Sequence, residues 1–437
     1  MNNLATVEET RPMNSPQTVN DNEIKKNTKK TVEKVLESNP VFEAFGNAKT
    51  VRNDNSSRFG KFTQLQYTVE NRLHADQNGR YSVPNCLLVG GFCSTYLLEK
   101  SRVTSHTAKE RSYHIFYQLL AAPEDQKTRI WEHLSGTRNQ SFKYIGYTDT
   151  HSIEGHSDEE SWRHTVAALK LFGFHGKSFY TLMRAICVVL QLGNIEFKAN
   201  NDENDGSEIS NLEELDKLSS LIGIAKEQIV EAMTIRVNKI GVDEFVVKPN
   251  PVDAKEGCDS LAKEIYARIF DHVVKNINDR TCAKLDSAGD SHGTISLLDI
   301  FGFERFEINR FEQLCINYAN ERLQQRYVLD NFRAVQKEYT AEGVELFDFS
   351  MVDNSGVVDV LEGKLGIISS LNEECMRPKG SPLSFVYKAK MMHCDSSYML
   401  SDKLHEVYEF GIKHFAGPVT YDASNFLQVR QHNTNIG

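Results

Sequence analysis

Two short polar segments, far apart in the sequence and each beside a predicted strand, constrain the fold of this chain more than any other feature. They are residues 53–61 and residues 299–304. Apolar and polar side chains alternate over residues 63–69, which predicts a half-buried strand after the first segment. Residues 294–300 are apolar and β-branched, which predicts a buried central strand that carries Asp299 at its carboxyl end. Since open α/β sheets bind ligands at the carboxyl ends of their strands, we expect an α/β fold with a site at this edge.

The first segment offers groups that suit a magnesium–phosphate centre. Ser56 and Ser57 supply hydroxyl oxygens for a hard cation or for an attacking water. Arg58 supplies a planar guanidinium that matches a carboxylate. A turn that opens a strand, with a solvated arginine, explains the same residues equally well. This segment alone therefore leaves both interpretations open.

The second segment offers a carboxylate and a glycine. Asp299 lies at the predicted strand end, Gly302 lets a backbone N–H approach a phosphate, and Glu304 can accept Arg58. A strand end followed by a phenylalanine-rich core turn is the competing interpretation, and it is equally open for this segment alone. The two segments together favour the phosphate site, because one mechanism needs both.

Two helices and a strand pair are also predicted. A lysine-rich segment, residues 23–36, leads into a helix that is predicted to end near residues 39–40, because Pro40 disfavours helical geometry in the residue before it. A long amphipathic helix is predicted from residue 309 to about residue 339, near 30 residues or roughly 45 Å. Its length suits a lever or relay element as well as a packing helix. Residues 410–421 predict a strand pair around Gly417.

Net charge, apolar runs and cysteine spacing limit the classes of partner that we expect for this chain. The net charge of -10 disfavours a general nucleic-acid binder, and no apolar run approaches the roughly 20 residues that span a bilayer. The 8 cysteines form no C-x-x-C pair, which favours a reduced intracellular protein. We therefore expect no nucleic acid and no membrane among the partners.

In this order the two segments resemble switch I (residues 53–58) and switch II (residues 299–304) of the myosin head. The likeness extends to further blocks, namely residues 36–40, 43–49, 96–103, 113–117, 192–195, 317–323 and 373–375. It covers about residues 23–427. The resemblance implies an α/β, P-loop NTPase-like motor fragment with an incomplete central mixed sheet surrounded by many helices, and a long relay helix that begins near residue 309.

ATP and Mg²⁺ are the cofactors that the resemblance implies. Asn53 would contact the nucleotide, Ser57 would bind Mg²⁺ directly, and Asp299 would hold Mg²⁺ through water.

The resemblance also implies the catalytic positions. Ser56 would place the attacking water, and the N–H of Gly302 would meet the γ-phosphate. Arg58 and Glu304 would form a bridge that closes when ATP is bound. Closing around a phosphoryl group positions water and stabilises charge, which is most of what phosphoryl transfer requires.

Actin filaments are the partner that the resemblance implies. Asp243, with Glu244 beside it, falls where the family carries an acidic or phosphorylatable residue of an actin-binding loop. A solvated acidic loop is an equally open interpretation. Residues 382–395 resemble part of an actin-binding helix-loop-helix, although Met391 and Met392 are also compatible with a core.

The sequence departs from the family pattern at the phosphate loop, the motif G-x-x-x-x-G-K-[ST]. The one Gly-Lys-Ser, at residues 176–178, has Leu171 where the first glycine belongs. Without the backbone donors and the lysine of this loop, we expect weak ATP binding or none. The strand that carries the loop is central in the family, so we also expect an exposed sheet edge.

These observations define an expected organisation: residues 1–22 disordered, 23–298 an upper 50-kDa-like subdomain with switch I, 299–427 a lower one with switch II and the relay helix, and 428–437 an unrelated tail. The expected function is that of a fragment of an actin-based, ATP-driven motor, inactive as it stands. The family's activity is an actin-activated Mg-ATPase. The alternative is a non-catalytic actin-binding module that retains the 50-kDa cleft. We expect a cytoplasmic, cytoskeletal protein of the myosin complex, with no light chains on this fragment.

Overall fold

The structure, a computed structural model, describes most of the chain. The described residues are 19–69, 86–150, 152–155, 157–200, 206–240, 243–283, 291–344, 353–377, 379–400 and 407–427. The chain divides into two compact units, Met1–Ile300 and Phe301–Gly437. Residues 1–18 and 428–437 lie outside the described residues, so the expected disorder there and the expected unrelated tail stay predictions.

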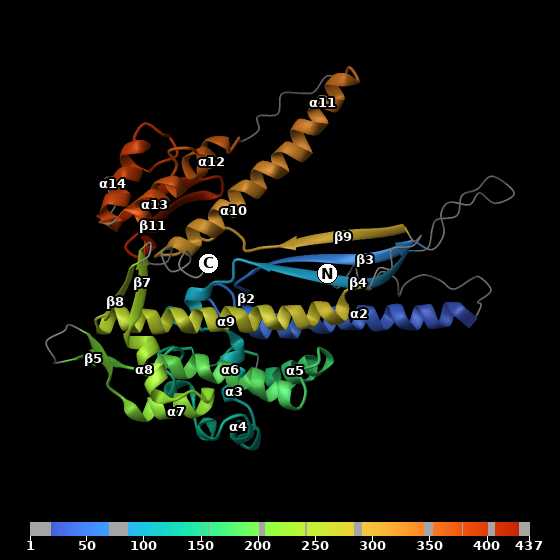
Figure 1. Ribbon diagram of the computed structural model, residues 1–437. Coiled ribbons are helices and arrows are strands. Elements are labelled where there is room, and N and C mark those ends of the chain that lie inside the picture. Colours follow the sequence, from blue (N-terminus) through green and yellow to red (C-terminus); the bar gives the residue numbers. More distant parts are fainter. Residues whose placement is uncertain are drawn as a thin grey trace. The chain divides into compact units, whose positions relative to one another are not determined.

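The first unit holds a three-stranded sheet in the order β4-β3-β9. The strands are β3 (Gly60–Val69), β4 (Cys86–Tyr96) and β9 (Ser291–Asp299), and both pairings are antiparallel. A mixed sheet was expected from the sequence, but in the described part of the chain this sheet is antiparallel. Figure 1 shows β9 along one side of β3.

The strand β9 is not the buried central strand that its apolar sequence predicts. Among the described strands it pairs only with β3, so it forms the sheet edge. Ile295 is 43% exposed and Leu298 is 51% exposed. An apolar run identifies side chains that favour burial, but it does not supply the neighbour that would bury them. An exposed edge, as expected from the sequence, is therefore present among the described strands.

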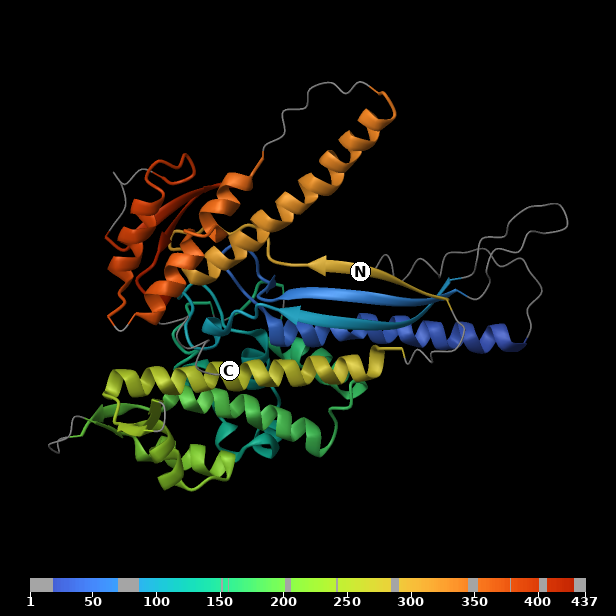
Figure 2. The same ribbon diagram turned by 45° about the horizontal axis from the view of Figure 1, so that its top comes forward.

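Two long helices lie side by side against β4, as Figures 1 and 2 show. They are α2 (Val19–Gly46) and α9 (Pro251–Thr281). The helix α2 was predicted to end near Pro40, but it continues through this residue to Gly46. Proline removes one helical hydrogen bond. Beyond it Val41, Phe42 and Phe45 are buried, and their burial outweighs that local cost.

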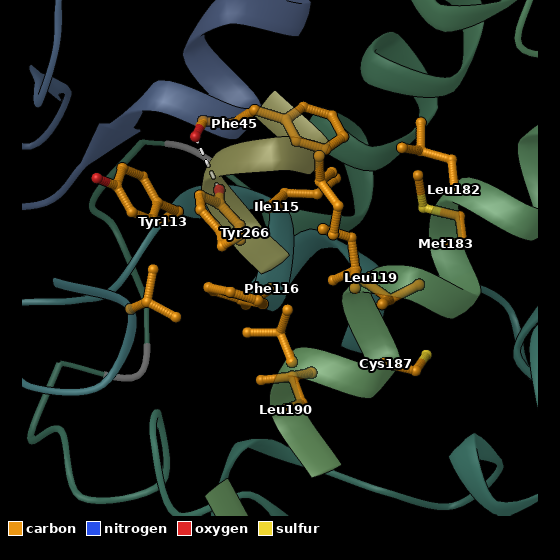
Figure 3. Packing of buried hydrophobic residues seen from close by; sticks show 14 of the residues in the cluster. Phe45, Tyr113, Ile115, Phe116, Leu119, Leu182, Met183, Cys187, Leu190 and Tyr266 are labelled. Atoms are coloured by element: carbon orange, nitrogen blue, oxygen red, sulfur yellow. Dashed lines mark hydrogen bonds between the residues drawn. The ribbon is translucent and has the colours of Figure 1, made fainter. Parts of the chain in front are cut away.

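A helical layer completes the first unit around one large apolar core. Tyr266 of α9 lies in this core, where its hydroxyl donates to the carbonyl of Phe45 at 2.7 Å (Figure 3). The rings of Tyr266 and Tyr113 stack with centroids 4.8 Å apart. The surrounding elements are α3 (His114–Leu120), α4 (Glu124–Ile130), α5 (Asp158–Leu171), α6 (Lys177–Asn194), α7 (Leu212–Ile222), α8 (Lys226–Thr234), β5 (Phe197–Ala199) and β6 (Ser207–Ile209).

The second unit begins with the long helix. The helix α10 (Phe311–Val328) continues through a π-helical turn (Leu329–Arg333) into α11 (Ala334–Ala341), which confirms the predicted extent to about residue 339. It packs with α12 (Ser355–Glu362), α13 (Ile367–Met376), α14 (Pro382–Met392) and the hairpin of β10 (Glu409–His414) and β11 (Gly417–Asp422). The predicted strand pair is confirmed, and Gly417 has the positive φ of 135° that its turn requires.

Within the described residues, no helix combines the length and the apolar character that crossing a membrane requires.

Candidate functional site

The pairing of β3 with β9 brings the end of the first polar segment and the start of the second to one end of the sheet. In the antiparallel register Lys61 lies opposite Asp299, so the start of β3 meets the end of β9. A Cβ atom on Gly60 would lie 3.3 Å from the side chain of Ile300. The segment that precedes β3 and the carboxylate that ends β9 are therefore neighbours, although they are far apart in the sequence.

The loop of the first segment is held by its own polar side chains. The carbonyl of Asn53 accepts the Thr50 N–H at 2.8 Å, and its side-chain oxygen accepts the Asn55 N–H at 2.9 Å. The side-chain oxygen of Asn55 in turn accepts from the Asn47 amide at 3.0 Å. Asn53 itself is exposed, so the loop presents a fixed polar surface to the solvent.

The two serines form a short strand against the end of α2. This strand, β2 (Ser56–Ser57), pairs with β1 (Asn47–Ala48), and both serines are half-buried. The Ser57 hydroxyl donates to the carbonyl of Phe59 at 3.0 Å. Because a hydroxyl has one donor and two lone pairs, its oxygen can still accept a cation, so Ser57 fits the role of a Mg²⁺ ligand.

Arg58 is not a solvated arginine. Its side chain is 1% exposed, and its Nε donates to Glu99 Oε2 at 2.6 Å. Its Nη1 donates to the Ser56 hydroxyl at 3.2 Å. The turn interpretation of this segment therefore fails for the arginine, which is a buried, paired cation.

Glu99 is a site residue that sequence reasoning missed. Its carboxylate accepts from Arg58 and also from Arg102, whose Nε lies 2.5 Å from Oε2. Burial raises the pKa of Glu99, but the two guanidinium groups outweigh it and hold that pKa at about 2. The available signal was the three-residue spacing of Glu99 and Arg102 at the turn Lys100–Val103.

Lys61 places a half-buried amine beside the end of β9. Its Nζ donates to Asn39 Oδ1 at 3.1 Å and lies 4.1 Å from the centre of the Phe42 ring. Burial lowers the pKa of Lys61, and the charges of Cys93 and Asp299 oppose that shift. Asp299 is itself exposed, so its carboxylate remains accessible to a hydrated cation.

In the second unit, side chains of α10 hold residues 301–304. The Asn320 amide donates to the carbonyl of Phe301 at 3.0 Å. The side-chain oxygen of Asn317 accepts the Glu304 N–H at 2.8 Å, and its Nδ2 donates to the Glu304 carbonyl at 2.8 Å. These asparagines lie in a block that the family resemblance marked without giving them a role.

Between these contacts Gly302 stays open. It is exposed, and a Cβ atom there would meet nothing within 4 Å. Phe301 is buried at 7% exposure, so the core-turn interpretation describes that residue but not the glycine that follows it. Gln313 donates to the Glu304 carboxylate at 3.2 Å. Arg58 lies in the first unit and Glu304 in the second, and the bridge between them stays a prediction.

The two regions expected to bind actin differ in what the structure describes. Asp243 and Glu244 open the strand β8 (Asp243–Val247), which pairs with β7 (Arg236–Ile240); their side chains lie outside the described residues. On α14, Met391 is 57% exposed and Met392 is 45% exposed. The alternative that these methionines belong to the core is therefore wrong.

Comparison with known proteins identifies the family. The sequence profile of the myosin head (motor domain) matches residues 1–435, a wider range than the 23–427 that the motifs indicated. The chain is 39% identical to Protein OPAQUE1 of Zea mays over 407 residues, which cover 91% of this chain and 25% of that protein. It is 36% identical to Myosin-52 of Schizosaccharomyces pombe, over 90% of this chain and 25% of the relative. It is also 36% identical to the human unconventional myosin-Vc, over 91% of this chain and 21% of the relative.

The chain belongs to the myosin head (motor domain) family. It spans between 21% and 25% of the length of these three relatives.

Proposed function

We propose that this chain carries the phosphate-sensing segments of an actin-based, ATP-driven motor. Residues 53–58 act as switch I and residues 299–304 as switch II, on a P-loop NTPase-like fold whose relay helix is the helical run of residues 311–341. The observation that supports this most is the register of Lys61 opposite Asp299, which brings the residue that opens the second segment beside the end of the first segment. The family membership supports the same assignment.

The residues of the two proposed switch segments are chemically suited to ATP and Mg²⁺. Ser57 offers hydroxyl lone pairs, Asp299 an exposed carboxylate, and Gly302 an exposed backbone position where a Cβ atom would meet nothing within 4 Å. We assign Ser57 as a direct Mg²⁺ ligand and Asp299 as a ligand through water. Bound Mg²⁺ would neutralise charge on the phosphates. Asn53 contacts the nucleotide in this proposal.

Two further residues complete the proposed chemistry. Ser56 places the attacking water, and its hydroxyl oxygen already accepts from Arg58 at 3.2 Å. Arg58 closes onto Glu304 when the γ-phosphate meets the N–H of Gly302. In this proposal Glu99 is the carboxylate that keeps Arg58 buried and oriented before that closure.

The 437 residues contain no G-x-x-x-x-G-K-[ST] motif, so we propose that this chain alone grips ATP weakly and is not an active motor. Charged hydrogen bonds are worth about 1.5–3 kcal/mol each, and the loop supplies several. Titration with a fluorescent ATP analogue, with and without Mg²⁺, is expected to show no binding tighter than about micromolar. Tight, Mg²⁺-dependent binding that Ser57→Ala abolishes would refute the loss of affinity.

A second function, a non-catalytic actin-binding module, is favoured by one exposed surface. We define the α14 surface as Leu383, Tyr387, Met391 and Met392, which are between 45% and 66% exposed. Apolar side chains exposed together on one helix are typical of an interaction site. We propose that this surface binds filamentous actin, together with Asp243 and Glu244 at the start of β8, and places the chain on the cytoskeleton.

Co-sedimentation with actin filaments tests this function. We expect the chain to enter the pellet equally with and without ATP, and the double variant Tyr387→Ser, Met391→Ser to bind at least tenfold more weakly, since each loses about 1.5–3 kcal/mol of apolar burial. Leu212→Ser is the matched control, because Leu212 is 64% exposed on α7. A folded chain that stays in the supernatant overturns the proposal.

A further inference from the structure

A buried chain of hydrogen bonds lies behind residues 301–304 in the second unit. It runs through Asn317 and Glu321 of α10, His414 of β10 and Tyr421 of β11. All four residues are nearly inaccessible, from 0% exposed for Asn317 to 4% for His414. Burying polar groups costs free energy unless each finds a partner, so the arrangement of protons along this chain is strongly constrained.

The backbone of Glu304 fixes the first link. A peptide N–H can only donate and a carbonyl can only accept. Asn317 must therefore turn its oxygen to the Glu304 N–H and its nitrogen to the Glu304 carbonyl, both at 2.8 Å. The second proton of that amide points to the Tyr421 hydroxyl oxygen at 2.9 Å. The orientation of the Asn317 amide follows from these contacts without further assumption.

The same logic determines the next two links. Because the Tyr421 oxygen accepts from Asn317, its own proton is free to donate to His414 Nε2 at 2.8 Å. Nε2 of His414 is the one acceptor that the described contacts give the Tyr421 proton, so the arrangement that satisfies this buried hydroxyl leaves Nε2 without a proton and protonates the neutral ring at Nδ1. Its Nδ1–H donates to Glu321 Oε1 at 3.0 Å. Burial raises the pKa of Tyr421 above its usual range, which agrees with a hydroxyl that keeps its proton.

At Glu321 the series of hydrogen bonds ends, because the remaining partners of its carboxylate are groups that can only donate or whose orientation is fixed. The Phe415 N–H donates to Oε1 at 2.9 Å, and the Asn354 amide donates to Oε2 at 2.6 Å. The Asn354 amide also donates to the carbonyl of Glu321 at 2.8 Å, which fixes its orientation. The carboxylate thus receives three hydrogen bonds and needs to donate none. A single arrangement of protons satisfies every group from Glu321 to Glu304.

We propose that Glu321, His414 and Tyr421 are positioning residues for residues 301–304, acting through the orientation of Asn317. The inference rests on the proposed function, because Gly302 and Glu304 are the phosphate-sensing positions there. Asn317 binds both peptide groups of Glu304, as a neighbouring strand would, and so fixes the backbone beside Gly302. The hairpin β10–β11 thereby contributes to the conformation of a segment more than one hundred residues earlier in the sequence.

The tautomer of His414 provides the first test, on the unsubstituted chain. Nitrogen-15 NMR of the histidine-labelled protein at pH 7 is expected to show one neutral ring protonated at Nδ1, and the signal is assigned by its disappearance in His414→Gln. The chain has 14 histidines, so this assignment variant is required. A His414 ring protonated at Nε2, or at both nitrogens, overturns the proposed order of donors.

Hydrogen exchange of the peptide that spans residues 301–306 provides the second test. Tyr421→Phe keeps the ring but removes the hydroxyl, which leaves one Asn317 N–H unpaired and His414 without its donor. We expect the Glu304 amide to exchange about tenfold faster, the effect of losing about one buried hydrogen bond. Tyr318→Phe is the control, since it also removes a tyrosine hydroxyl, but that hydroxyl lies on α10 beside Asn317 and donates to Glu362 instead.

Equal exchange in Tyr421→Phe and the unsubstituted chain overturns the positioning role. Should Tyr421→Phe unfold, the tautomer measurement still decides the proposal. Neither measurement uses nucleotide, so weak ATP binding, which concerns the proposed function, cannot be mistaken for failure of this inference.

Discussion

The two polar segments are held by opposite kinds of chemistry. In the first unit, the buried carboxylate of Glu99 binds two permanently charged groups, Arg58 and Arg102. In the second unit, the buried carboxylate of Glu321 binds donors that include the ring of His414, and residues 301–304 are held by neutral amides. Arginine keeps its charge at every relevant pH. A neutral asparagine amide instead stabilises its partner only through hydrogen bonds, which depend on its orientation.

This difference predicts how each segment fails. An ion pair in a buried site is costly to break, because the remaining charge stays out of water. A neutral hydrogen-bond chain loses about one bond at a time. Substitutions that remove a charge are therefore expected to destabilise residues 53–58 most. Substitutions that replace a hydrogen-bond donor with an acceptor are expected to destabilise residues 301–304 most.

The largest expected effect is that of Glu99→Gln. Glutamine keeps the size of the side chain but removes the negative charge that the buried Arg58 and Arg102 share, although Arg102 keeps its contact with Glu110 at 3.2 Å. This loss is expected to cost about 3–5 kcal/mol of unfolding free energy. Urea denaturation followed by tryptophan fluorescence measures it, because the 2 tryptophans, Trp131 and Trp162, both lie in the first unit.

Glu159→Gln is the matched control for this substitution. Glu159 pairs with Arg163 at the surface, where both side chains are more than half exposed. Such pairs contribute about 0.2–1 kcal/mol. Equal losses in the two variants would contradict the view that a buried ion pair holds Arg58.

The acid stability of the first unit gives the next largest effect. The pKa of Glu99 in the folded chain is about 2, against an ordinary value of 4.5. A depressed pKa stabilises the fold above the unfolded value, and that stability is lost as the pH falls from 4.5 to about 2. The loss is on the order of 3 kcal/mol at about 1.4 kcal/mol per pH unit.

Tryptophan fluorescence in urea at a series of pH values between 5 and 2 measures this loss. The Glu99→Gln variant is expected to show a flatter profile, because it no longer has the carboxylate that titrates. An unchanged slope in that variant would assign the acid sensitivity to other groups.

The sequence was sufficient to predict elements whose pattern is local. The strand over residues 63–69, the helical run to about residue 339 and the strand pair around Gly417 all follow from periodicity and turn chemistry. The position of Asp299 at a strand end was predicted for the same reason. The exposure of β9 was not predictable from its own residues, since burial depends on a neighbour.

The contacts of the candidate site were less predictable. Pro40 was predicted to end a helix, but buried side chains beyond it extend that helix. The pairing of Arg58 with Glu99 joins residues 41 positions apart, and no periodicity identifies such a pair. The role of Asn317 depends on Tyr421, which folds back from another part of the second unit. Sequence patterns identify which residues are polar, whereas tertiary contacts decide which of them meet.

A smaller effect, confined to the second unit, is expected for Asn317→Asp. Aspartate cannot donate, so the Glu304 carbonyl and the Tyr421 hydroxyl each lose a donor, and a new carboxylate faces that carbonyl. We expect a loss of about 2 kcal/mol, within the range for unsatisfied buried groups. Hydrogen exchange of peptides from residues 301–344 and 407–427 measures it.

Asn331→Asp is the matched control on the same helical run. Asn331 is exposed, and its amide donates only to the carbonyl of Tyr327 at 3.1 Å. Exchange in the first unit is expected to stay unchanged in both variants. Faster exchange over β3 in Asn317→Asp would show that the two segments do not fail independently.

The smallest expected effect, that of Ser56→Ala, decides which group holds Arg58. The substitution removes the hydroxyl that accepts Nη1 at 3.2 Å, while the contact of Nε with Glu99 at 2.6 Å remains. Ser56 is half-buried, so water can replace part of the lost bond, and we expect a loss of about 0.5–1 kcal/mol in the tryptophan-monitored urea transition. A loss as large as that of Glu99→Gln would mean that the serine, and not the buried carboxylate, orients the guanidinium. A loss near zero would leave Glu99 as the partner that holds Arg58, and would leave the Ser56 hydroxyl free for the water that we assign to it.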